Sequence, residues 1–171
     1  MSGVNLTIIS CNKKISKSSN FFSDLGFDKE KKQDGEFFCE FTVNKILSTK
    51  EKDIFIHDDF YVYYNENLKN HGYSEQLWKK IIKKLNNPLC SLNMICMSRN
   101  YGSYYVLSKH LKELILEGYH FYIVSNNVDN KIKKKFNSPT DLLEIENNTY
   151  LLSNKVINYL IQNEVLDFFE Y

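Results

Sequence analysis

The sequence contains no alanine and a single arginine, Arg99, among its 171 residues. Alanine codons are GC-rich, whereas the codons of lysine and asparagine, which occur 21 and 20 times, are AT-rich. We therefore attribute part of the lysine excess to an AT-rich coding sequence. The near-absence of arginine argues against a phosphate-binding surface, because arginine is favoured for bidentate contacts with phosphate. Nucleic-acid binding is thus kept only as a lesser alternative.

Long apolar runs and cysteine motifs are also missing. No apolar stretch approaches the length that crosses a bilayer, and the first residues carry neither a secretion signal nor a second-position glycine for myristoylation. The four cysteines form no CxxC pair and no His-x3-5-His accompanies them, so we expect buried thiols rather than zinc ligands or disulfides: Cys11, Cys39, Cys90 and Cys96. We expect a cytoplasmic location, no bound metal and no cofactor.

Charge is distributed unevenly along the chain. Residues 1–60 have a net charge of −1, residues 61–140 of +7 and residues 141–171 of −5. Such a separation can orient a charged partner during association. The alternative is that the acidic end folds back on the basic middle and neutralises it.

The periodicity of apolar residues predicts an α+β protein. Strands are expected over 4–11, 36–44, 91–98 and 119–126, a short helix over 16–27, and a solvated turn over 29–35. Residues 53–67 read as either one long strand or a hairpin that turns at Asp58–Asp59, and we favour the hairpin or a sharp bend because adjacent aspartates are typical of turns. Helices are expected after Ser74, from about Arg99 to Gly118 and after Ser153, and residues 127–139 as a polar loop or frayed helix. A second hairpin is expected to turn at Asn147–Asn148.

Residues 91–126 read as a strand, a helix and a strand, which predicts a parallel, right-handed βαβ unit. The helix would pack on the sheet through Leu107, Leu111, Leu114 and Ile115. No repeat or linker divides the chain. We therefore expect a single α+β domain over residues 1–171, with a mixed sheet of about six to eight strands and about four helices.

Two polar clusters are candidate sites. Arg99 is expected at the carboxyl end of a parallel strand and just before a helix, where an anion or a partner's carboxylate would be favoured. A lone residue without a partner motif nevertheless favours the alternative, an ordinary surface charge. The run His57–Asp59 contains residue types that bind metals. None of the other histidines lies at ligand spacing from it, which favours a turn instead.

The order of elements is similar to that of GNAT-type N-acetyltransferases. In that family an R/Q-x-x-G-x-G/A loop between a strand and a helix binds the pyrophosphate of acetyl-CoA. The matching segment would be Lys69–Ser74, in which Gly72 alone fits fully, whereas in "RNYGSY" Arg99 and Gly102 fit but Tyr104 does not. The resemblance implies an acyltransferase or a degenerate relative, and we carry over no catalytic residue from it.

The leading functional hypothesis is a protein-binding inhibitor rather than an enzyme, of the kind formed by bacterial immunity proteins that neutralise a toxin. The expected partner is a protein, such as a cationic toxin or nuclease domain whose active site would be occluded. An acidic end and a tyrosine-rich middle support this hypothesis, since tyrosine is enriched in interface hot spots. The candidate partner-binding residues are Arg99, Tyr101, Tyr104, Asp141, Glu144, Glu146, Glu164, Asp167 and Glu170.

Overall fold

The computed structural model describes residues 4–14, 30–33, 36–48, 53–64, 67–96, 101–126, 128–163 and 165. The strands are β1 (Val4–Ser10), β2 (Glu30–Gln33), β3 (Glu36–Ser48), β4 (Asp53–Tyr64), β5 (Cys90–Cys96), β6 (Phe121–Ser125), β7 (Leu142–Glu146) and β8 (Thr149–Ser153). The helices are α2 (Glu75–Lys84), α3 (Tyr101–Leu116), α4 (Asn130–Lys135) and α5 (Asn154–Gln162). The helix predicted at 16–27 lies outside the described residues.

An α+β architecture is confirmed, with an antiparallel sheet. Five strands, in the order β5-β1-β6-β8-β7, carry the described core, and β4, β3 and β2 continue the sheet beyond β5. Every described pairing is antiparallel. The expectation of a mixed sheet of about six to eight strands is therefore corrected to an antiparallel sheet whose core-bearing part has five strands.

The predicted βαβ unit is present in a split form. Both β5 and β6 pair antiparallel with β1, so they run parallel to each other with β1 between them. The helix α3 connects them, as the sequence predicted. Adjacent parallel pairing was the wrong part of the prediction, because a strand from the start of the chain occupies the central position.

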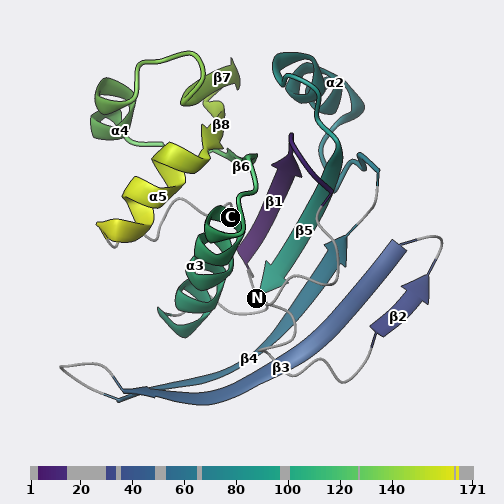
Figure 1. Cartoon of the computed structure of the whole chain (residues 1–171), viewed down its shortest axis with the longest axis vertical. Helices are drawn as coiled ribbons and strands as arrows, with labels where there is room; N and C mark the ends of the chain where they lie inside the picture. Colours follow the sequence, from purple (N-terminus) through teal and green to yellow (C-terminus); the bar gives the residue numbers. More distant parts are fainter. Residues whose placement is uncertain are drawn as a thin grey trace.

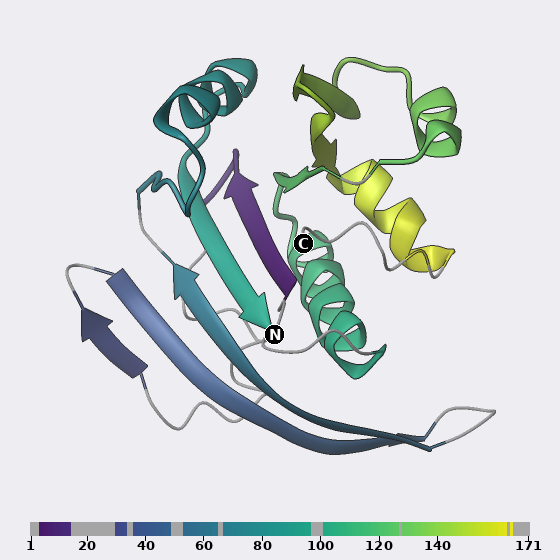
Figure 2. The same ribbon diagram turned by 180° about the vertical axis from the view of Figure 1, so that it is seen from behind.

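The two faces of the sheet are covered by different helices. Alternate residues of β1, β5, β6 and β8 pack against α3, α4 and α5, and the intervening residues of β1, β6 and β8 pack against α2. The views in Figures 1 and 2 show α3 and α5 close together and α2 apart from them. The predicted stripe on α3 is confirmed, with Leu107, Leu111 and Leu114 fully buried.

Helix ends follow the predicted chemistry. The Ser74 hydroxyl accepts a hydrogen bond from the Leu77 amide at 3.2 Å and caps α2. At the end of α3, the Tyr119 amide donates to the Leu114 carbonyl and the Gly118 amide to that of Ile115, while Gly118 adopts a φ of +77°. This is a Schellman motif, which needs a left-handed residue after the helix.

Two turn predictions had opposite outcomes. The hairpin at Asn147–Asn148 is confirmed, and both residues have positive φ, as a type I′ turn requires. The turn at Asp58–Asp59 is wrong: β4 is continuous, and these residues pair with Val43 and Thr42 of β3. Residues 30–33 of the predicted solvated turn form β2 instead.

The hairpin of β3 and β4 is the most extended part of the described structure. Its twelve register pairs run from Phe37↔Tyr64 to Ser48↔Asp53. Both ribbon views show the two strands curving together past the rest of the molecule (Figures 1 and 2). We call residues 40–48 of β3 and 53–59 of β4 the ribbon.

Candidate partner-binding surface

The described acidic candidates do not form one free patch. The Asp141 carboxylate lies 2.7 Å from the Lys155 ammonium group and its side chain is 15% exposed. Glu146, on β7, is ion-paired with Lys80 of α2. Glu144 is exposed. Two of the three predicted contacts are thus engaged within the chain, and one of them, Glu146 with Lys80, joins the acidic end to the basic middle.

The remaining candidates are only partly described. Arg99, Glu164, Asp167 and Glu170 lie outside the described residues. Tyr101 is the first residue of α3. Tyr104 is half-buried and packs against the core on the α3 side of the sheet, so it contributes at most part of its surface to a partner.

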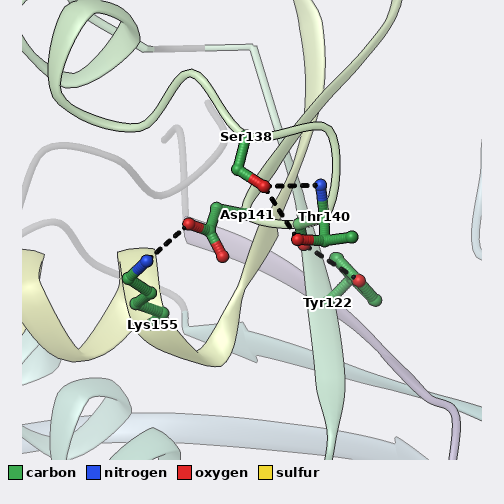
Figure 3. A network of polar contacts seen from close by, with 5 residues as sticks. All are labelled: Tyr122, Ser138, Thr140, Asp141 and Lys155. Atoms are coloured by element: carbon green, nitrogen blue, oxygen red, sulfur yellow. Dashed lines mark hydrogen bonds and ion pairs between the residues drawn. The ribbon is translucent and has the colours of Figure 1, made fainter.

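Asp141 belongs to a corner held by local polar contacts (Figure 3). The Tyr122 hydroxyl donates to the Thr140 carbonyl at 3.1 Å, and the hydroxyls of Ser138 and Thr140 lie 2.9 Å apart. Burial first, and the nearby Cys11 and Asp141 second, raise the pKa of Tyr122. The corner therefore positions the start of β7, and its groups are already occupied by one another.

The loop proposed as a pyrophosphate site is bound to its own side chains and to β5. The Ser91 hydroxyl accepts from the Lys69 amide at 2.8 Å and donates to the Lys69 carbonyl at 2.9 Å. The Asn70 carboxamide accepts from the Tyr73 amide at 2.8 Å. Since these amides are engaged, the loop offers a pyrophosphate fewer donors than the resemblance implies.

Ser91 also contacts a histidine, in an arrangement that superficially resembles a nucleophile and its base. The His71 Nε2 atom lies 3.1 Å from the Ser91 hydroxyl oxygen. Burial, and then the neighbouring Lys69, lower the pKa of His71 to about 4. Ser91 is 1% exposed and its proton is directed at the Lys69 carbonyl, so the pair holds the loop rather than attacking a substrate.

The other titratable groups in the core have structural roles. His110 of α3 is fully buried, and burial lowers its pKa to about 3, which keeps the imidazole neutral. Burial, reinforced by Cys90, raises the pKa of Cys11 to about 11, so its thiol is a poor nucleophile at neutral pH. Cys90 is buried and Cys11 half-buried; neither forms a disulfide, and they pack on opposite faces of the sheet. Within the described ranges, no three His, Cys, Asp or Glu side chains converge on a metal position.

The two lysine-rich helices do not combine into one basic surface. In Figures 1 and 2, α2 and α4 lie on either side of the β7–β8 hairpin. In α2, Lys79 and Lys80 are paired with Glu75 and Glu146. In α4, Lys133 lies over the Tyr150 ring and Lys135 over the Tyr159 ring, each 4.6 Å from the ring centre.

The sequence analysis did not identify the ribbon, whose two strands have backbone edges without a described partner strand. On the side of β4 away from β3, the described partner is β5, and this pairing covers only Phe60–Tyr64. In β3, the described pairing with β2 covers only Glu36–Cys39. The signal was present in the sequence: two β-rich segments of similar length flank a charged run at 49–52. We instead divided the second segment at its two aspartates.

Searches against protein-family models, curated proteins and solved structures each find no match. In the described part of the chain, no helix has both the length and the apolarity to cross a membrane.

Proposed function

We propose that this chain is a protein-binding inhibitor, of the kind in which a small immunity protein covers the active site of a toxin. The observation that supports the proposal is the ribbon, which extends beyond the body and presents strand edges that no described strand pairs with. Exposed strand edges recruit strands from other chains unless they are blocked. A partner bound along the ribbon would be held beside the body of this protein, which would then cover a cleft of the partner.

The charge of the ribbon is suited to a cationic partner. Its β4 half, Asp53–Asp59, contains three carboxylates and no lysine or arginine. Glu144 adds an exposed carboxylate on β7. Complementary charge accelerates encounter and makes the association rate fall with added salt.

The test uses the product of the neighbouring gene as the candidate toxin. Cells that produce the candidate toxin should stop growing, and co-expression of the present chain should restore their growth. The two purified proteins should form a complex whose association slows as salt is raised. Growth inhibition that is unaffected by co-expression, together with no complex at micromolar concentrations, would refute the proposal.

The acyltransferase alternative is separated from this proposal by one measurement. A ligand that binds only the folded state raises the melting temperature by mass action. Acetyl-CoA at millimolar concentration should leave the melting temperature unchanged if the chain is a protein-binding inhibitor. A clear increase would favour the acyltransferase instead.

A further inference from the structure

The outer edges of β7 and β2, like the two edges of the ribbon, have no described partner strand, and the outer edges of β7 and β2 are protected. The outer strand β7 has five residues, a bulge between Glu144 and Glu146, and contacts with α2. The outer strand β2 has four residues, Glu-Lys-Lys-Gln. Short, bulged and charged strands resist pairing with another chain. The two segments of the ribbon are longer and pair with each other in continuous register, and the charged residues of the β4 segment are all aspartates, which disfavour an acidic strand but not a basic one.

The β4 edge of the ribbon differs from the β3 edge in its surroundings. A strand added to Asp53–Asp59 would lie in line with β5, whose last described pair with β4 is Cys96↔Phe60. Helix α3 contacts β4, and both views show the beginning of α3 directed towards the ribbon (Figures 1 and 2). An added strand would therefore lie on the side of β4 that is next to β5, with α3 as the helix that contacts β4. Among the described elements, none offers such cover to a strand added to the outer side of β3.

The charge of this edge selects the kind of strand that it accepts. Antiparallel pairing with a second copy, centred on Ile56, would place Asp53 of each copy opposite Asp59 of the other. Like charges in opposite positions destabilise a sheet. A strand with basic residues at the corresponding positions would instead gain from both aspartates. The favoured occupant is thus a different protein with a basic edge.

The geometry points to the β4 edge of the ribbon, Asp53–Asp59, as the site that accepts an extended basic strand of a partner protein in antiparallel or parallel pairing. This inference rests on the proposed function and specifies the contact that it uses. Main-chain hydrogen bonds supply the binding, and Asp53 and Asp59, which share a face of the strand by alternation, supply the preference for a basic strand.

The direct probe is a peptide as long as the free segment, with alternating lysine and β-branched residues. Its binding to the full-length protein is measured by hydrogen exchange and by titration calorimetry. Alternate amides within Asp53–Asp59 should gain protection, whereas those of β7 should not. When alternate amides of the same peptide are N-methylated, its affinity should fall by about tenfold or more, because the peptide has lost the hydrogen-bond donors along one edge. Absence of binding at millimolar concentration, or equal binding of both peptides, would overturn the inference.

A matched pair of variants tests the charge preference. Asp59→Asn and Glu75→Gln each remove one carboxylate, one on the ribbon and one at the start of α2. The basic peptide should bind more weakly to the first variant and unchanged to the second. An equal effect of the two changes would show general charge attraction and would overturn the assignment to this edge.

The outcomes separate the inference from the proposed function. If the neighbouring gene's product binds without protecting Asp53–Asp59, the assignment of the edge is wrong and the inhibitor function stands. If the edge binds the peptide but that product forms no complex, the inhibitor function is wrong and the strand-binding edge stands.

Discussion

Buried histidines make the stability of this protein depend on pH. The folded-state pKa values of His110 and His71 are lowered to about 3 and about 4, below the usual value of 6.5. Between the lowered pKa values of the folded state and the usual value of 6.5, the unfolded state therefore binds more protons than the folded state. The stability that is present above pH 6.5 is lost as the pH falls through this range. For His110 alone the loss approaches about 1.4 kcal/mol per pH unit below about pH 6.

Denaturant titrations between pH 7 and pH 5 measure this effect. Replacing His110 with glutamine, which does not titrate, should flatten the dependence of the unfolding free energy on pH, whatever its effect at pH 7. The matched control is His120→Gln, since the His120 side chain is exposed. An unchanged pH slope in the His110→Gln variant would contradict the burial of a neutral imidazole.

Gly118 provides a second test at the scale of one residue. Its φ of +77° is left-handed, and an added Cβ would meet no atom within 4 Å. Gly118→Ala should therefore cost about 1 kcal/mol through backbone conformation alone. Gly118→Asn should cost less, because asparagine tolerates this conformation better. Equal losses for the two variants in chemical denaturation would argue against the Schellman motif.

At the scale of elements, local signals explain what the sequence predicted and what it did not. The serine cap of α2, the glycine end of α3 and the type I′ turn at Asn147–Asn148 each rest on residues adjacent in the chain, and each is confirmed. Asp58–Asp59 failed because turn propensity was overridden by pairing with β3. The partners Val43 and Thr42 lie far enough away in sequence that no local pattern identifies them.

The helix α3 allows a prediction in which the residue type is held constant. Leu107 is fully buried, whereas Leu116 is 77% exposed. Leu107→Ala should lower the unfolding free energy by about 2–5 kcal/mol, because a cavity remains in the core. Leu116→Ala should change it by less than about 0.5 kcal/mol. Similar losses in the two variants would contradict the orientation of the helix.

At the scale of the whole molecule, the strand order could not be predicted. β1 lies between β5 and β6, which are separated from it by most of the chain, so the order depends on long-range pairing. The candidate site was limited in the same way. Asp141 and Glu146 were predicted as contacts with a partner protein, and their partners within the chain, Lys155 and Lys80, are set by packing between elements. The ribbon became a candidate only when the extent of its pairing with neighbouring strands was visible.

We propose that the ribbon binds the partner and that the rest of the molecule folds without it. Replacing residues 44–57 with Asn-Gly would join Val43 to Asp58, which already face each other, through a type I′ turn. The described pairing partners of the removed strand residues lie within the removed segment, so the melting temperature should change little.

The decisive measurement is the affinity of this shortened protein for the neighbouring gene's product, compared with that of the full chain by titration calorimetry. We predict a loss of about 100-fold or more in affinity, with the near-ultraviolet circular dichroism of the body retained. A folded, shortened protein that binds with unchanged affinity would show that the partner contacts another surface.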